Sequence, residues 1–246
     1  MNSQTYLLAL KNRIIQDKLD EDTRNYIKGL EGELFIKDIL DEYPDLHYLY
    51  DFHINYKNRV QIDFLIVTDD SICHFEVKHY SGDYTIKDGQ LMNEFGNMFY
   101  TPFQQLRRAN HELNYLISNL NINKPLHSYL IFSNPKFTLK GTMPNQFNIL
   151  LPTELHKLKY MFKNNHTIEN ANILHMFQQE HSDFSHLYNN IKKVPMSNLR
   201  PGLKCPKCKR LNTVEVENKY TLRRICDKHF NYFRKKPKKY FLNNDD

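Results

Sequence analysis

Two apolar runs joined by an acidic turn, Gln61–Thr68 (QIDFLIVT) and Ser71–Lys78 (SICHFEVK), constrain the fold of this chain most strongly. β-Branched and aromatic residues dominate both runs, and the two aspartates between them are typical of a tight turn. The pattern predicts two adjacent strands that form a hairpin. Asp63 and Glu76 place carboxylates inside these otherwise apolar runs, and Lys78 ends the second one.

The spacing of these charged residues indicates a candidate reaction site. Side chains alternate along a strand, so Glu76 and Lys78 share a face, and the hairpin brings Asp63 close to them. Neighbouring carboxylates raise each other's pKa, a divalent cation relieves that conflict, and oxygen ligands suit Mg²⁺ or Mn²⁺. Lys78 would then orient or activate water, or stabilise charge on a phosphate. The same spacing also fits an ordinary strand face with a Glu–Lys pair.

Helical and strand patterns alternate along the rest of the chain. We expect helices over residues 1–19, 20–42, 153–163 and 168–191, and one that opens at Thr101-Pro102, where Thr suits the cap and Pro the first turn. Further strands are expected over residues 47–54, within 84–92, and over 128–133 and 147–151. This order predicts an α/β sandwich.

Glu33 falls on the apolar face of the second predicted helix, among Leu30 and Leu40. A carboxylate aimed toward the core needs a partner there. The alternative is a surface pair with Lys37, one helical turn further on.

Four segments, in order, resemble the nuclease-related domain (NERD) family, which is similar to the PD-(D/E)xK superfamily of restriction-endonuclease-like enzymes. The segments are Gly29–Glu33 (GLEGE), Gln61–Val67 (QIDFLIV), Phe75–Gly82 (FEVKHYSG) and Thr101–Gln105 (TPFQQ), and the resemblance covers roughly residues 25–135. It implies a restriction-endonuclease-like mixed sheet flanked by helices, with a metal at the sheet edge. The Thr at the start of the last segment departs from the family, which often has Asn there.

The resemblance also implies roles for individual residues. The expected metal ligands are the carboxylates of Asp63 and Glu76, aided by the Val77 carbonyl. Glu33 matches the family's helical acidic residue, Lys78 its catalytic lysine, and Gln105 the glutamine that follows the proline of the last segment. From the residues alone, Gln105 is equally an ordinary polar residue of a first helical turn.

The C-terminal region carries a zinc-ligand pattern. Its spacing, C-x2-C followed by C-x2-H, is close to that of structural zinc sites, and the four donors are Cys205, Cys208, Cys226 and His229. Residues 213–217 and 220–225 alternate like a hairpin, so we expect a small zinc-ribbon-like module that depends on zinc for stability. The alternative is that the histidine is incidental and the thiols are free.

Charge is unevenly distributed, since residues 190–246 carry 16 Lys or Arg against 5 Asp or Glu, and the remainder carries 18 against 23. We expect a domain over residues 1–193, a linker over 194–202 and the basic module over 203–246. A basic module suggests a nucleic-acid partner, contacted by Lys207, Lys209, Arg210, Arg223 and Arg224. A charged protein-docking surface is the alternative.

These observations favour a metal-dependent nuclease acting on nucleic acid, with DNA the first expectation. A nucleic-acid-binding or adaptor protein that keeps the fold without cleaving is the second interpretation, and recruitment of a protein partner by the C-terminal module is the third. The sequence shows no apolar stretch of membrane-spanning length and no secretory signal, so a cytoplasmic location is expected.

Overall fold

The computed structural model describes residues 3–10, 13–14, 20–87, 89–99, 102–142, 148–162, 168–183, 194–205, 210–218, 221–224 and 232–234. The chain divides into two compact units, one formed by Met1–Arg24 with Ile191–Asp246 and the other by Asn25–Asn190. The domain boundaries expected near residues 193 and 202 remain a prediction. None of the helices described is long and apolar enough to cross a membrane.

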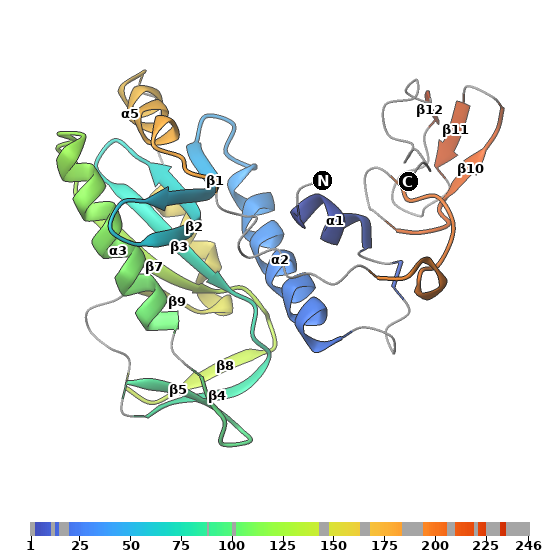
Figure 1. Cartoon of the computed structure of the whole chain (residues 1–246), viewed down its shortest axis with the longest axis horizontal. Helices are drawn as coiled ribbons and strands as arrows, with labels where there is room; N and C mark the ends of the chain where they lie inside the picture. Colours follow the sequence, from blue (N-terminus) through green and yellow to red (C-terminus); the bar gives the residue numbers. More distant parts are fainter. Residues whose placement is uncertain are drawn as a thin grey trace. The chain divides into compact units, whose positions relative to one another are not determined.

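A five-stranded mixed sheet forms the centre of the larger unit (Figure 1). Its order is β1-β2-β3-β7-β9, in which the first three strands are antiparallel and the last three are parallel. The strands are β1 (His47–Asn55), β2 (Arg59–Val67), β3 (Ile72–Lys78), β7 (Leu126–Phe132) and β9 (Asn148–Leu150). The predicted hairpin is therefore confirmed as β2 and β3.

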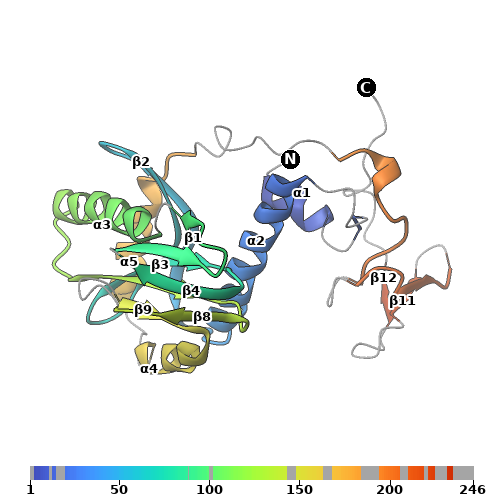
Figure 2. The same cartoon turned by 90° about the horizontal axis from the view of Figure 1, so that it is seen from below.

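Helices cover both faces of this sheet. One face packs against α2 (Glu21–Leu40), η2 (Pro152–Lys157) and α4 (Leu158–Met161), and the other against α3 (Pro102–Asn119) and α5 (Ile168–Gln179). Figure 2 shows α3 and α4 on opposite sides of the sheet. The buried residues of α3 recur at helical spacing and form one apolar face, which explains why the helix packs on the sheet. They include Leu106, Ala109, Leu113 and Leu116.

A second, four-stranded sheet lies beyond the end of β3. Its order is β6-β5-β4-β8, and its strands are β4 (Gly82–Lys87), β5 (Gln90–Asn93), β6 (Met98–Phe99) and β8 (Phe137–Lys140). Stacking of Phe132 on Phe137, with ring centroids 4.0 Å apart, connects it to the main sheet. The strand pair predicted within residues 84–92 is confirmed as β4 and β5, whereas β6 and β8 were not predicted.

The mixed α/β architecture is confirmed, but three predicted helices differ in extent. The N-terminal helix α1 (Ser3–Leu10) ends before Arg13, which lies in a turn. The segment expected as helix 153–163 begins as the 3-10 helix η2. Helix α5 ends at Gln179 instead of continuing through residue 183, because the chain turns back and the Ser182 N–H donates to the His53 carbonyl at 2.9 Å.

The smaller unit joins the two ends of the chain. The Arg200 N–H donates to the Arg13 carbonyl at 2.6 Å, and Lys204 Nζ donates to the Ala9 carbonyl at 2.8 Å. Beyond the 3-10 turn η4 (Met196–Asn198), a small antiparallel sheet contains β10 (Val214–Val216), β11 (Thr221–Arg224) and β12 (Tyr232–Arg234). The hairpin predicted over residues 213–225 is thus present as β10 and β11.

The predicted zinc site falls largely outside the described residues. Only Cys205 of the four predicted ligands is described, and it is buried beside Val214 and Leu222. The others, Cys208, Cys226 and His229, lie outside the described residues, as do Lys207 and Lys209. The zinc ribbon therefore remains a prediction.

Candidate functional site

The carboxylate of Asp63 lies where strands β2 and β3 part. Backbone pairing between the two strands runs from Val67 opposite Ile72 to Phe64 opposite Phe75. One residue further, Asp63 Oδ2 accepts a hydrogen bond of 2.7 Å from the Val77 N–H. A side-chain oxygen thus accepts a hydrogen bond from a backbone N–H just past the last paired residues of β2 and β3. This hydrogen bond holds the buried carboxylate between the two strands.

Glu76 and Lys78 share one face of β3, as strand alternation predicts. Lys78 Nζ contacts Glu76 Oε1 at 2.6 Å, and only 8% of the Glu76 side chain and 17% of the Lys78 side chain are exposed. The structure therefore confirms a Glu–Lys pair at this position. Because it is largely withdrawn from water, the pair differs from the exposed ion pairs that contribute little to stability.

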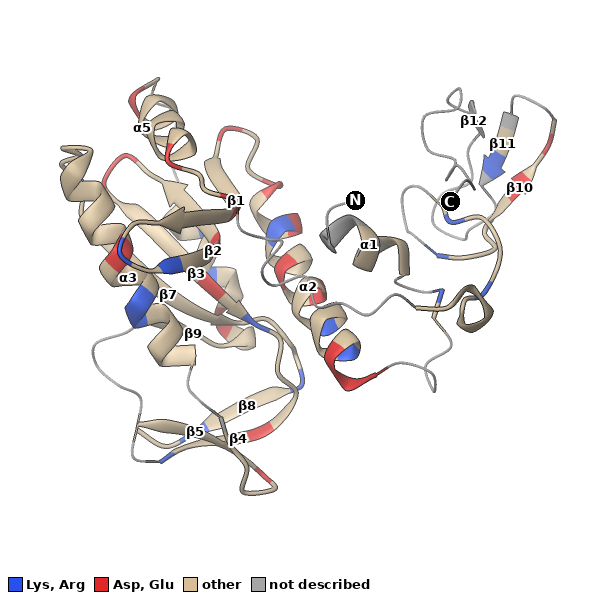
Figure 3. Ribbon diagram, in the orientation of Figure 1, with Lys and Arg blue, Asp and Glu red and all other residues tan. Residues whose placement is uncertain are grey.

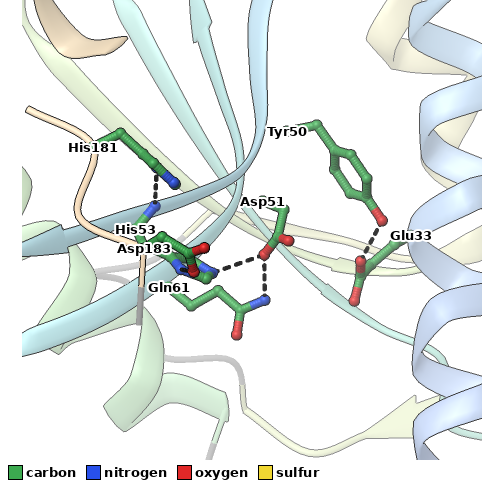
Figure 4. Close-up of polar contacts among 7 residues, drawn as sticks. All are labelled: Glu33, Tyr50, Asp51, His53, Gln61, His181 and Asp183. Carbon is green, nitrogen blue, oxygen red and sulfur yellow. Dashed lines mark hydrogen bonds and ion pairs between the residues drawn. The ribbon is translucent and has the colours of Figure 1, made fainter. Parts of the chain in front are cut away.

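Glu33 approaches the sheet from α2 and meets Tyr50 of β1 (Figure 4). The Tyr50 hydroxyl donates to Glu33 Oε2 at 2.7 Å. Lys37, the surface partner that sequence spacing allows, instead pairs with Asp41 at 2.7 Å. The helical carboxylate is thus oriented by a tyrosine that the sequence analysis did not identify.

Two of the three carboxylates, those of Asp63 and Glu33, have raised pKa values. Burial raises the pKa of Asp63 well above its usual range, and the charges of Glu76 and Glu33 raise it further. Burial likewise raises the pKa of Glu33 to about 7; the Tyr50 hydrogen bond opposes this shift, and the charges of Asp51 and Glu76 add to it. The cluster therefore brings acidic groups together where burial and mutual repulsion oppose their ionisation.

Lys78 is the cation of this cluster. Burial alone would lower its pKa, but the charges of Glu76 and Asp63 and the hydrogen bond to Glu76 outweigh burial and raise it. Lys78 thus stays protonated at neutral pH. One ammonium group faces three carboxylates, so the cluster is arranged to attract further positive charge.

The donor set fits a hard divalent cation. Asp63 and Glu76 each use one oxygen in the contacts given above, and the second oxygen of each makes no hydrogen bond to any residue that the structure describes. With the Val77 carbonyl they form an oxygen-only set, which Mg²⁺ and Mn²⁺ prefer. Within the described residues, His, Cys, Asp and Glu side chains form no group of three or more that could hold a metal, so this set would need the carbonyl or water.

A second polar cluster adjoins Tyr50 along β1 (Figure 4). Asp51 Oδ1 contacts His53 Nε2 at 2.9 Å and accepts a hydrogen bond from Gln61 Nε2 at 2.7 Å. The ring of buried His53 also stacks on His181, beyond the end of α5. Asp51 adopts a positive φ of 55°, which non-glycine residues rarely do in a strand. Sequence reasoning missed this cluster, since its contacts depend on strand pairing.

The remaining predicted site residues lie apart from the carboxylate cluster or do not reach it. Gln105 is exposed in the first turn of α3, and no hydrogen bond or ion pair joins it to Glu33, Asp63, Glu76 or Lys78 in the described structure. Of the basic residues proposed to bind nucleic acid, Arg210 is exposed, Arg223 pairs with Glu215 at 2.7 Å, and Arg224 ends β11. Figure 3 shows acidic and basic positions interspersed on α2 and α3.

Comparison with known proteins supports the resemblance found in the sequence. Residues 28–133 match the model of the nuclease-related domain, and this segment contains Glu33, Asp63, Glu76 and Lys78. No curated protein matches the chain. The crystal structure of protein VC1899 from Vibrio cholerae is similar at 12% identity and a TM-score of 0.29, over 67% of this chain and 38% of that one, a likeness too weak to carry an argument.

Proposed function

We propose that the unit formed by Asn25–Asn190 is a metal-dependent nuclease core that hydrolyses phosphodiester bonds of nucleic acid, with DNA as its first substrate class. The observation that carries the proposal is the buried cluster of Asp63, Glu76 and Lys78 at the point where β2 and β3 part. It lies inside the segment that matches the nuclease-related domain. The family match supports the chemistry, and the cluster supplies the groups that such chemistry needs.

Asp63, Glu76 and the Val77 carbonyl are the groups that would hold Mg²⁺ or Mn²⁺. Bound there, the cation supplies a Lewis acid that neutralises charge on a phosphate and lowers the pKa of water. The crowding of Asp63 with Glu76 and Glu33 favours such binding, because a cation relieves the repulsion between neighbouring carboxylates and stabilises their charged forms.

Lys78 would act as a fixed positive charge. Its raised pKa keeps the ammonium group protonated, which makes it a poor acceptor for a proton from water. The contact with Glu76 fixes the position of Nζ in a largely dry environment. A preorganised cation of this kind stabilises negative charge that develops on a phosphate oxygen.

Glu33 is the residue we propose as proton acceptor. A pKa of about 7 means that this carboxylate exchanges a proton near neutral pH, which is the property that a general base needs. The Tyr50 hydroxyl holds one oxygen, Oε2, and thereby fixes the orientation of the group. We therefore propose that Tyr50 is the residue that orients Glu33.

The C-terminal residues would contribute to binding of nucleic acid. We propose that the excess of Lys and Arg in residues 190–246 supplies phosphate contacts, and that zinc held by the predicted Cys and His donors stabilises the module. Burial of Cys205 against the β10–β11 hairpin is consistent with such a structural role.

A nuclease assay tests this proposal. Purified full-length chain is incubated with single-stranded DNA, double-stranded DNA or RNA in Mg²⁺, Mn²⁺ or EDTA. We expect metal-dependent cleavage that is lost in Lys78→Ala and Asp63→Ala. Lys37→Ala is the matched control, since Lys37 also pairs with a carboxylate but outside the cluster, and it should cleave normally. Binding of nucleic acid without cleavage in any metal would favour the non-cleaving interpretation instead.

A further inference from the structure

The outer face of α3 carries positive charge and no exposed acidic side chain. Its exposed positions include Arg107, Arg108, His111 and Tyr115. Glu112 is the only acidic residue of this helix, every residue of which the structure describes, and its side chain is completely buried. An exposed face with basic groups and without acidic ones attracts a polyanion.

Glu112 holds the turn between β1 and β2 against α3. Its Oε2 accepts a hydrogen bond from the Lys57 N–H at 3.1 Å, and its Oε1 accepts one from Asn58 Nδ2 at 2.7 Å. This turn adds four consecutive exposed residues to the surface, none of them acidic: Tyr56, Lys57, Asn58 and Arg59. The turn therefore extends the basic face of α3 and is fixed to it by a buried group.

Two tyrosine rings belong to this surface, one from the turn and one from α3. The ring centroids of Tyr56 and Tyr115 are 5.0 Å apart, with an angle of 53° between the ring planes. The two residues are 48% and 37% exposed, respectively. Asn119 Nδ2 donates a hydrogen bond to the Tyr56 hydroxyl and so fixes the more exposed ring. The surface thus presents aromatic area to solvent in a preordered position, which lowers the entropic cost of stacking on a ligand.

Three cationic side chains accompany these rings. Lys57 Nζ lies over the Tyr115 ring, 4.2 Å from its centroid, and Arg108 Nη2 donates to the Arg59 carbonyl at 3.4 Å. Cations beside exposed aromatic rings are typical of surfaces that bind single-stranded nucleic acid, because the cations contact phosphates and the rings stack on unpaired bases. A duplex offers such a surface its phosphates alone, since its bases are already paired and stacked.

We propose that this surface binds an unpaired stretch of the nucleic acid on which the carboxylate cluster acts. Tyr56, the more exposed ring, stacks on a base, and Lys57, Arg59 and Arg108 contact phosphates. Strand β2 begins at Arg59 and contains Asp63, so about 13 Å of extended backbone separates the surface from the cluster. A few nucleotides span that distance. The proposal rests on the proposed nuclease function and names single-stranded segments as its substrate.

Binding in EDTA, which prevents cleavage, tests the charges of the surface. The probe is a fluorescently labelled single-stranded DNA oligonucleotide, and its anisotropy on the full chain is measured at several salt concentrations. In the combined variant Lys57→Gln, Arg59→Gln and Arg108→Gln, the slope of log affinity against log salt should become shallower by about 2, since each phosphate contact of a single strand contributes about 0.7. Lys28→Gln, which removes an exposed charge from α2, is the control and should leave the slope unchanged.

Substitution of Tyr56 tests stacking with the same probe. Tyr56→Ala should bind the single strand about tenfold more weakly. Tyr56→Phe keeps the ring, loses only the hydroxyl that Asn119 contacts, and should bind like the wild type. Both variants should bind a blunt-ended duplex of the same sequence normally. Tyr160→Ala removes an exposed ring from α4, on the opposite face of the sheet, and should change neither affinity.

The outcomes separate this surface from the nuclease assignment. An unchanged salt dependence in the combined variant, or normal binding of the single strand by Tyr56→Ala, overturns the surface even if the chain cleaves DNA. Equal loss of single-strand and duplex affinity in Tyr56→Ala also overturns it, because stacking on an unpaired base cannot be the cause. Absence of binding by the wild type has the same meaning. If the variants behave as expected but no metal supports cleavage, the surface stands and the nuclease assignment falls.

Discussion

Asp63 Oδ2 accepts a hydrogen bond from the Val77 N–H at 2.7 Å, one residue beyond the last backbone pair of β2 and β3. This contact has two consequences. It provides a hydrogen-bond acceptor for the Val77 N–H, which lies beyond the last backbone pair of β2 and β3. It also fixes the Asp63 carboxylate beside Glu76. A single side chain therefore contributes both to the fold and to the candidate site.

The two roles of Asp63 can be separated by substitution. Asp63→Asn keeps an acceptor for the Val77 N–H and removes a buried charge, so the fold should be as stable as the wild type or more so at pH 8. Asp63→Ala leaves the donor unsatisfied and should be less stable than Asp63→Asn by about 1–3 kcal/mol. Urea unfolding measures both. Cleavage should be lost in both variants, and equal stability of the two would contradict the role of the hydrogen bond.

Stability should fall with rising pH because of Glu33. Its carboxyl has an ordinary pKa of 4.5 in the unfolded chain and about 7 in the fold, so the folded state binds more protons between these values. The fold therefore loses stability as pH rises from about 4.5 to beyond 7. Glu33→Gln should remove this loss and raise stability at pH 8 by on the order of 2 kcal/mol.

Thermal unfolding of Glu33→Gln at pH 5 and pH 8 tests this expectation. Asp38→Asn, at an exposed position of the same helix, is the control and should change little at either pH. An unchanged pH dependence in Glu33→Gln would mean that another group is responsible. In the nuclease assay Glu33→Gln should lose activity. Unfolding would not explain this loss, because the substitution is expected to stabilise the fold.

The hairpin and its charged residues were predictable because they depend on local pattern. Alternation along one strand placed Glu76 and Lys78 together, and the apolar runs identified β2 and β3. The helical wheel placed Glu33 on the inward face of α2. It could not show whether Tyr50 or Lys37 would be the hydrogen-bond or ion-pair partner of Glu33, because that depends on how α2 packs on β1. The contacts of Asp51 and His53 depend on strand pairing and on the position of His181, which periodicity does not encode.

Lys78 should matter for stability as well as for activity. Lys78→Met keeps the apolar stem but leaves Glu76 buried without its cation, which typically costs about 3–5 kcal/mol. The loss should be larger at pH 8 than at pH 5, where Asp63 and Glu33, with their raised pKa values, take up protons. The double variant Lys78→Met with Glu76→Gln should recover much of it. Lys37→Met, in a more exposed pair, should cost less than about 1 kcal/mol.

Binding of zinc to the chain should require Cys205 and should not require Cys73. Both cysteines are buried, but Cys73 lies in the core of the large unit, whereas Cys205 begins the C-x2-C pattern. Metal analysis of the purified chain should find zinc in the wild type and in Cys73→Ala, and little in Cys205→Ser. Zinc retained by Cys205→Ser, or absent from the wild type, would contradict the zinc-binding module.

Two glycines of α2 should respond in opposite ways to the same substitution. Alanine is favoured over glycine in a helix by up to about 1 kcal/mol, and a Cβ at Gly29 would meet nothing within 4 Å, so Gly29→Ala should be neutral or stabilising. A Cβ at Gly32 would collide with His79 and Ser133, so Gly32→Ala must push α2 away from the strand ends or shift both side chains. We expect a loss of about 1–3 kcal/mol in urea unfolding. Equal effects of the two substitutions would show that α2 does not lie against the ends of β3 and β7 in solution.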